Sequence, residues 1–376
     1  MTVDRPRRAG WIELFFDLVF VAIVAQLARQ LEGDPGAVDF GRFLLLFLPP
    51  WWSWLNFTTF VNVADGDRPR TRMSLLAAMA CMGAMAVAVP DALGERADVY
   101  ALGYIVSRAV SFALWLPVAL SRDDGLTLAR VAAFNGAGTA LWIVSLFVPM
   151  PWQAVLWMAG VGCEVAVLAG AQRRGLERAY DVGHIVERVG LFVIIVLGES
   201  IVTSLDGLAE HWSGPGWVTL GFGFVLCAAL WWGYFDHGSA IAARELSTGE
   251  NARIRDVMGL GHFPVVAALI AMGAGLGTAV AEPHHLPFGA ALAMCGGLVA
   301  YRLSFLLMSL RAHRLVSDAL LRALLGVPIA VAVLAASASL PAWGVVALLA
   351  AEVVAQLLRG IASSRRTMSG SPEYQL

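Results

Sequence analysis

Apolar residues are grouped along the chain in twelve long stretches, which short segments of charged and turn-forming residues separate. About 20 mainly apolar residues suffice for a helix to cross the roughly 30 Å hydrocarbon core of a bilayer. The pattern therefore predicts an all-α fold, a polytopic bundle of about twelve transmembrane helices. The predicted spans are residues 11–31, 40–63, 73–90, 97–120, 129–149, 152–171, 184–205, 216–237, 258–280, 286–310, 318–339 and 341–360.

Composition agrees with this pattern. Of the 376 residues, 59% are hydrophobic and only 14% are charged, and the mean hydropathy is +0.71. Soluble proteins carry about 25% charged residues, so the chain is expected to be an integral membrane protein surrounded by lipids. Little of it remains outside the spans, and we expect no separate soluble domain for catalysis.

Arginine accounts for all 26 Lys and Arg positions and is distributed unevenly between the loops. The odd-numbered loops hold three arginines, Arg29, Arg42 and Arg96, against twenty in the termini and even-numbered loops. Cytoplasmic loops are enriched in basic residues, so both termini are expected in the cytoplasm. The twenty are Arg5, Arg7, Arg8, Arg68, Arg70, Arg72, Arg122, Arg130, Arg173, Arg174, Arg178, Arg244, Arg253, Arg255, Arg311, Arg314, Arg322, Arg359, Arg365 and Arg366.

Four features recur in the same order in both halves of the chain. They are paired tryptophans (Trp51-Trp52 and Trp231-Trp232), a lone arginine (Arg108 and Arg302), a lone glutamate (Glu164 and Glu352), and a glutamate near the start of each half (Glu13 and Glu187). We expect two six-helix halves, residues 1–180 and 181–376. Because each half has an even number of spans, both halves would begin on the same side of the membrane and would be parallel repeats. The alternative is coincidence in a chain rich in Ala, Leu and Trp.

Six acidic side chains fall within the predicted spans. A charge near the bilayer centre costs about 2.5–3.5 kcal/mol on insertion scales unless protein or water shelters it. We therefore expect these groups to face a shared polar interior, where the function would reside. The six are Glu13, Asp17, Glu164, Glu187, Glu199 and Glu352.

The first span carries two carboxylates, Glu13 and Asp17, spaced so that both lie on one helix face. Two like charges this close can share a proton. The alternative is a solvated first turn, where acidic residues interact favourably with the helix dipole. Aromatic residues on both sides of the pair favour burial.

The seventh span carries the largest number of polar candidates. His184 and Arg188 are four residues apart and share a face, whereas Glu187 points elsewhere, so both Glu187 and Arg188 need partners on other helices. Glu199 lies on the face of Arg188 but about 16 Å further along the axis. Glu199 is the strongest single candidate, as a proton carrier or as a ligand for a cationic or hydroxylated substrate. The alternative is a neutral acid that hydrogen-bonds a backbone carbonyl.

Arg108 and Arg302 lie in the middle of the fourth and tenth spans. An arginine at this depth must pair with a carboxylate or a bound anion. The available carboxylates are Glu164, Glu352, Glu13 and Glu187. Internal pairs would hold the helices together, whereas an unpaired arginine would form an anion site.

Two further polar candidates, Asn56 and Asp236, follow the tryptophan pairs of the second and eighth spans. The tryptophans could line a cavity or simply pack, and the polar residues beside them could contact a substrate or a proton.

We expect no metal, haem or other cofactor. His184 and Glu187 have one turn of metal-ligand spacing, but a di-metal site needs several such groups, and no histidines match in depth on facing spans. The four cysteines are more than sixty residues apart and form no CxxC motif. With a net charge of −2 and no basic stripe interleaved with aromatics, the chain is not expected to bind nucleic acid.

Three segments together resemble the bacterial low temperature requirement A (LtrA) family. They are the octapeptide ELFFDLVF from Glu13 to Phe20, the Trp-Trp pair of the second span, and His184-x-x-Glu187-Arg188 followed by LGES ending at Glu199-Ser200. The resemblance covers nearly the whole chain and implies a polytopic bacterial membrane protein of a family named for growth in the cold. It names neither a substrate nor an oligomeric state.

Three functions are compatible with these patterns. Twelve spans, two halves and buried charges of both signs favour a transporter or permease for a small solute, coupled to protons through the buried carboxylates. A non-catalytic membrane component that supports growth in the cold is the first alternative. The second is a membrane-embedded enzyme acting on a lipid from the cytoplasmic side. It is less favoured, because no metal–diphosphate motif or nucleophile–base pair is present.

Overall fold

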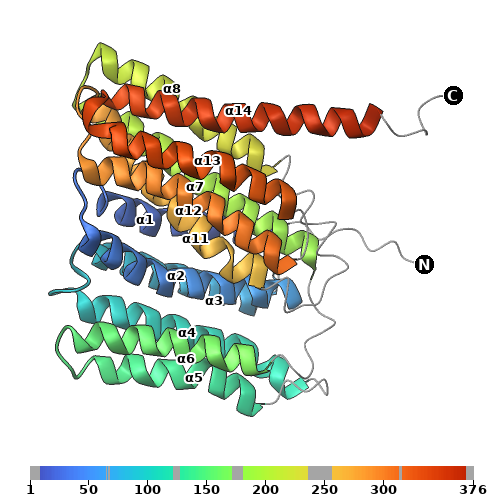
Figure 1. Cartoon of the computed structure of the whole chain (residues 1–376). Coiled ribbons are helices and arrows are strands. Elements are labelled where there is room, and N and C mark those ends of the chain that lie inside the picture. The colour runs from blue at the N-terminus through green and yellow to red at the C-terminus, as the bar shows by residue number, and fades with distance from the viewer. Residues whose placement is uncertain are drawn as a thin grey trace. The chain divides into compact units, whose positions relative to one another are not determined.

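The computed structural model describes residues 9–64, 66, 68–121, 128–171, 181–235, 256–312 and 316–369. Within these ranges the secondary structure is helical, with twelve α-helices (Figure 1). They are α1 (Trp11–Arg29), α2 (Ala37–Val63), α3 (Pro69–Ala88), α4 (Ala97–Ser121), α5 (Leu128–Ser145), α6 (Trp152–Ala171), α7 (Val182–Glu210), α8 (Gly214–Trp232), α11 (His262–Ala281), α12 (Phe288–Ala312), α13 (Val316–Ala336) and α14 (Ala342–Ser369).

Local sequence explains where several helices begin. Proline at the first turn starts α3, where its missing N–H would have had no partner. Ser213 caps α8, because its hydroxyl accepts a hydrogen bond from the backbone N–H of Gly216 at 3.1 Å. Asp181 caps α7 in the same way, accepting from the N–H of His184 at 3.1 Å.

Eight of the described helical segments are long and apolar enough to cross a membrane. They correspond to α1, α3, α4, α8, α11, α12, α13 and α14. The other four helices are α2, α5, α6 and α7, of which α2 and α7 carry the polar residues of the candidate site. The protein is an all-α polytopic membrane protein.

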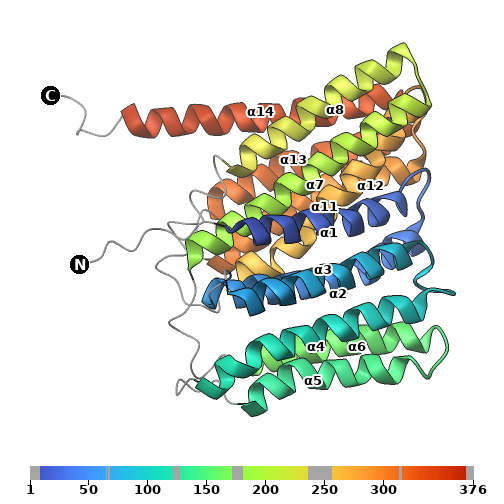
Figure 2. The ribbon, with the colours of Figure 1, turned by 180° about the vertical axis from the view of Figure 1, so that it is seen from behind.

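The chain divides into two compact units. Unit 1 comprises Met1–Gln30, Gly36–Ile195 and Leu246–Phe263, and therefore holds α1 to α6 and the first part of α7. In this unit α5 packs against α6 and α4, and α3 packs against α4 and α1. The three helices α4, α5 and α6 lie side by side in both views (Figures 1 and 2). Buried residues occur on all sides of α2 from Trp51 to Thr58, so α2 is an inner helix.

Unit 2 comprises Leu31–Pro35, Val196–Glu245 and Pro264–Leu376. Here α12 packs against α13, and α14 packs against α8 (Figure 2). Small residues allow close helix contacts, as is common in membranes. A Cβ atom at Gly275 of α11 would lie 2.7 Å from the carbonyl oxygen of Ala290 in α12.

Candidate functional site

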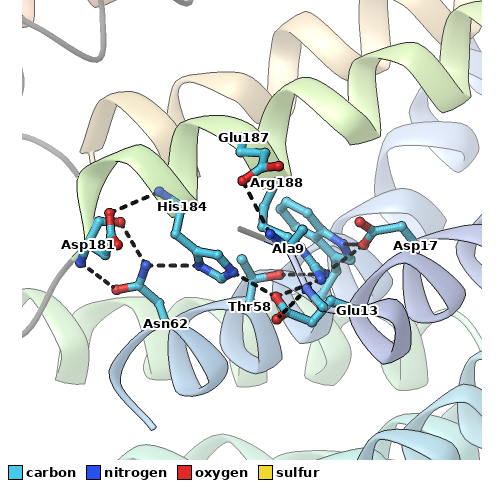
Figure 3. A network of polar contacts seen from close by, with 11 residues as sticks. Ala9, Glu13, Asp17, Thr58, Asn62, Asp181, His184, Glu187 and Arg188 are labelled. Atoms are coloured by element: carbon cyan, nitrogen blue, oxygen red, sulfur yellow. Dashed lines mark hydrogen bonds and ion pairs between the residues drawn. The ribbon is translucent and has the colours of Figure 1, made fainter. Parts of the chain in front are cut away.

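The two acidic residues of α1 are buried and face the same partner. Glu13 is 3% exposed and Asp17 is fully buried. Arg188 of α7 reaches both: its Nη1 donates to Oε2 of Glu13 at 3.0 Å, and its Nη2 donates to Oδ1 of Asp17 at 2.8 Å (Figure 3). The four-residue spacing in α1 therefore lets one guanidinium contact two carboxylates. We refer to Glu13, Asp17, His184 and Arg188 as the α1–α7 cluster.

Helix α2 adds neutral polar groups to this cluster. The indole Nε1 of Trp54 donates to Oδ1 of Asp17 at 2.7 Å, and Arg188 Nη2 lies 3.4 Å from the hydroxyl of Thr58. Trp54, Thr58 and Asn62 are spaced by four residues and form one stripe along α2. This stripe was not predicted, although its four-residue spacing is present in the sequence.

The orientation of Asn62 determines the tautomer of His184. The backbone N–H of Asp181 donates to Oδ1 of Asn62 at 3.0 Å, and Nδ2 of Asn62 donates to the Asp181 carbonyl at 2.8 Å. With the amide fixed, Nδ2 lies 3.2 Å from Nδ1 of His184, which must accept (Figure 3). Nε2 of His184 therefore carries the proton and donates to Oε2 of Glu13 at 2.9 Å.

Four aromatic rings lie next to the inner end of the cluster. Trp54 packs on Trp51 with ring centroids 5.1 Å apart, and Phe192 contacts Trp54 at 4.9 Å and Phe20 at 5.1 Å. These four residues are buried. The polar contacts run from Asp17 toward the first turns of α1 and α7, while an apolar layer closes the other side.

Glu187 differs from the expectation for buried acidic residues. It lies on the exposed side of α7, and its Oε2 accepts a hydrogen bond from the backbone N–H of Ala9 at 3.2 Å. Because Glu187 and Arg188 are adjacent, they point in different directions. Only Arg188 faces the cluster.

A second polar contact set joins α2 to α4. Ser111 donates to the side-chain oxygen of Asn56 at 2.6 Å, and Ser107 contacts Ser53 at 3.3 Å. The predicted candidate Asn56 is thus buried and satisfied by a neighbouring helix. Hydrogen bonds of this kind hold transmembrane helices together.

The lone arginine of α4 pairs with the lone glutamate of α6. Arg108 Nη2 lies 3.1 Å from Oε2 of Glu164, and both side chains are at most 1% exposed. The same carboxylate oxygen accepts from Trp52 Nε1 at 2.7 Å and from the Tyr104 hydroxyl at 3.0 Å. Among the described residues, Arg108 Nε and Nη1 and Glu164 Oε1 have no hydrogen-bond partner.

The same pairing occurs in unit 2. Arg302 of α12 lies 3.2 Å from Oε2 of Glu352 of α14, and Gln356 donates to the other oxygen of that carboxylate. Of the alternatives left open for Arg108 and Arg302, a carboxylate or a bound anion, the structure shows pairs with the carboxylates of Glu164 and Glu352.

Two remaining candidates lie elsewhere. Glu199 is half-buried on α7, in the part of this helix that belongs to unit 2. Asp236 lies outside the described residues. Within the described ranges, no group of three or more His, Cys, Asp or Glu side chains could hold a metal ion.

Charge balance distinguishes the three buried ionic groups of the described chain. The Arg108–Glu164 and Arg302–Glu352 pairs each combine one positive and one negative group. The α1–α7 cluster combines two carboxylates with one guanidinium and a histidine whose hydrogen bonds fit the neutral form. It therefore carries one excess negative charge unless a cation or proton is added.

Comparison with known proteins gives a family. Residues 8–358 match the model of the bacterial low temperature requirement A protein (LtrA). The chain is also similar to "Uncharacterized protein RA0937" of Rhizobium meliloti (strain 1021), with 29% identity over 313 residues that cover 78% of this chain and 75% of that protein. The family model covers the ELFFDLVF and HxxER segments that supply the cluster, and this chain belongs to the bacterial low temperature requirement A family.

Proposed function

We propose that this protein transports a small solute across the bacterial cytoplasmic membrane and couples that transport to protons through the α1–α7 cluster. The observation that carries the proposal is the excess negative charge of Glu13, Asp17 and Arg188, buried in helices of a membrane protein. An uncompensated charge is costly in this environment, so loading and release of a cation can bias a conformational equilibrium.

The Arg108–Glu164 pair is the best-supported candidate for solute contacts in unit 1. Unlike the α1–α7 cluster, it is balanced, yet two guanidinium nitrogens and one carboxylate oxygen are unpartnered in the described chain. These donors and the acceptor suit a small polar solute that both accepts and donates hydrogen bonds. In unit 2, Glu199, Arg302 and Glu352 are the corresponding candidates, and Asp236 is retained from the sequence.

Proton-coupled transport predicts that a transported solute changes the pH inside proteoliposomes. The full chain would be reconstituted with entrapped pyranine, and pools of amino acids, sugars, nucleosides, polyamines and organic acids would be added outside. At least one pool is expected to shift the internal pH relative to protein-free liposomes. If no pool shifts the pH while radiolabelled solutes are also excluded, the transport proposal fails.

The internal ion pairs of Arg108 and Arg302 support a second candidate function, a non-catalytic membrane component. Arg108 and Arg302 each bind an internal carboxylate, as expected of residues that only hold helices together. This alternative predicts that variants lacking the charges lose stability but still support growth in the cold when expressed at wild-type levels. Loss of growth at an unchanged protein level would favour transport.

We propose further that all twelve helices cross the membrane and that both termini are cytoplasmic, because twenty arginines lie on one set of loops against three on the other. A green fluorescent protein fused after residue 369 is expected to fluoresce, whereas alkaline phosphatase at the same position should be inactive. Both reporters inserted between Ser213 and Gly214, in an odd-numbered loop, should give the reverse. Active phosphatase after residue 369 would contradict this orientation.

The two halves of the chain, residues 1–180 and 181–376, are proposed to be parallel repeats. Support comes from matched contacts. Gly103 lies five residues before Arg108 and meets Met85, and Gly297 lies five residues before Arg302 and meets Met272. Glycines also face the two buried carboxylates: a Cβ at Gly138 of α5, or at Gly326 of α13, would lie 2.6 Å from Oε1 of Glu164 or Glu352, respectively.

These glycines lead to a stability prediction. Gly138→Ala and Gly326→Ala are each expected to destabilise the protein by about 1–3 kcal/mol, because the added methyl group must displace a paired carboxylate. The measurement is the midpoint of thermal aggregation by fluorescence-detected size exclusion. Gly136→Ala is the matched control on α5, because a Cβ there meets nothing within 4 Å. Equal midpoints for Gly138→Ala and Gly136→Ala would contradict the tight approach.

A further inference from the structure

The excess charge of the α1–α7 cluster can be assigned to one atom by considering each ionisable group in turn. The groups that face each other are Glu13 and Asp17 on α1, and His184 and Arg188 on α7 (Figure 3). Helix α2 contributes neutral side chains to these contacts. Helix α3 also packs on α1. Its buried residues include no charged side chain, and the thiol of Cys81 is the titratable group among them.

His184 is not the carrier of a compensating positive charge. Its Nδ1 faces the amide nitrogen of Asn62, and that amide is held in place by two hydrogen bonds with the backbone of Asp181. A proton on Nδ1 would bring two N–H groups face to face and break this contact. The arrangement therefore fits a neutral imidazole.

Glu13 is arranged as an ionised carboxylate. Its Oε2 accepts hydrogen bonds from His184 Nε2 and Arg188 Nη1, and its Oε1 accepts from the backbone N–H of Gly10 at 3.2 Å. Both oxygens thus have donors, and donors to the charged form favour it. A proton on either oxygen would compete with a hydrogen bond already present.

Asp17 differs between its two oxygens. Oδ1 accepts from Trp54 and Arg188, whereas Oδ2 has no hydrogen-bond partner among the described residues, although Asp17 is fully buried. Beyond it lies the aromatic layer of Phe20, Trp51, Trp54 and Phe192. An uncompensated carboxylate oxygen in this apolar position is energetically unfavourable.

We propose that Asp17 Oδ2 holds the exchangeable proton of this protein, and that its loading neutralises the α1–α7 cluster. The step is a simple acid dissociation: the Oδ2–H bond breaks, the electron pair stays on the carboxylate, and water takes the proton. The proton reaches Asp17 from the end where α1 and α7 begin, because the polar contacts among the described residues run from Asp17 through Arg188 and Glu13 to His184 in that direction. The proposal rests on the proposed function and names its coupling residue.

Charge balance predicts the effect of two conservative variants. Asp17→Asn removes the proton-binding oxygen. Glu13→Gln removes one negative charge, so Asp17 should ionise and pair with Arg188 without needing a proton. Both variants are therefore expected to lack a protonated carboxylic acid that the wild-type protein has. Asp206→Asn, an exposed acidic residue on α7, is the matched control and should leave it unchanged.

The test is infrared spectroscopy of the full chain reconstituted in lipid at neutral pH, observing the C=O stretch of protonated carboxyl groups and its shift in D2O. We expect one band per chain that disappears in Asp17→Asn and in Glu13→Gln. A wild-type protein without this band, or a band that survives in either variant, would overturn the proposal. If Asp17→Asn does not fold, Glu13→Gln carries the test.

A second infrared measurement distinguishes a proton at Asp17 Oδ2 from an alkali-metal ion bound there. Replacing choline chloride by sodium or potassium chloride should leave the band intact. Its loss on adding either ion would mean that a metal cation occupies Oδ2, which would overturn the proton assignment. The infrared result does not depend on transport. An intact band in a protein without solute-driven proton flux would contradict the proposed function but support the proton site.

Discussion

Replacing Arg188 by leucine is expected to destabilise the protein by about 3–5 kcal/mol, because removal of one partner leaves the other buried charges uncompensated. Here ionised Glu13 loses its cation, and protonated Asp17 loses a hydrogen-bond donor to its Oδ1. The expected result is a large fall in the thermal aggregation midpoint and in the yield of monodisperse protein. Fluorescence-detected size exclusion after heating measures both.

A double variant separates charge from packing. Adding Glu13→Gln to Arg188→Leu removes the ionised carboxylate that has lost its cation, so part of the lost stability should return. Arg188→Lys keeps the charge but cannot contact both carboxyl groups in the forked geometry of a guanidinium. Its stability should therefore lie between those of the wild type and Arg188→Leu. The charge account would be contradicted if Arg188→Leu were as stable as the wild type, or if Glu13→Gln gave no rescue.

The second large effect is expected at the Arg108–Glu164 pair. Arg108→Leu alone should cost about 3–5 kcal/mol, because Glu164 stays buried without a cation. The double variant Arg108→Leu/Glu164→Leu should recover most of that loss, since a buried ion pair can often be replaced by apolar residues at little cost. The same size-exclusion measurement gives the stabilities of the wild type, Arg108→Leu and the double variant for this comparison.

A transport measurement tests whether the Arg108–Glu164 pair also contacts the solute. If Arg108 and Glu164 contact the solute, the stable double variant should retain the fold but lose solute-driven pH changes. A double variant that is no more stable than Arg108→Leu would contradict the pairing. One that is stable and still active would remove the pair from the solute site.

Much of the fold follows from the apolar pattern, because a membrane helix needs a long apolar stretch whatever its neighbours are. The observed helices α1, α4 and α12 begin or end close to the predicted spans. Eight helical segments also meet a strict test of length and composition. The helices α2 and α7, where the polar residues of the site lie, are not among these eight segments.

The partners of the charged residues were only partly predictable. Helical spacing predicted that His184 and Arg188 share a face, and both reach Glu13. Spacing within one helix does not say which other helix faces it. The sequence therefore left Glu164, Glu352, Glu13 and Glu187 as candidate partners for Arg108, and the packing of the helices brings Glu164 to it.

Exposure and glycine contacts were harder to predict still. Glu187 is adjacent to buried Arg188 but is exposed, because a step of one residue turns the side chain by about 100° around the helix. The need for glycine at 138 depends on how closely α6 brings the Glu164 carboxylate to α5. That distance depends on how α5 and α6 pack together and cannot be read from the sequence of either helix alone.

The central claim is that protons move through the α1–α7 cluster and that Asp17 carries them. Its most direct test is solute-driven proton flux in proteoliposomes, with wild type, Asp17→Asn and the control Gly136→Ala reconstituted at equal amounts. We predict that the solute pool active with wild type drives equal flux in Gly136→Ala and at least about tenfold less in Asp17→Asn, since loss of a positioned proton carrier typically costs 10²–10⁴ in rate. Undiminished flux in Asp17→Asn would contradict the account.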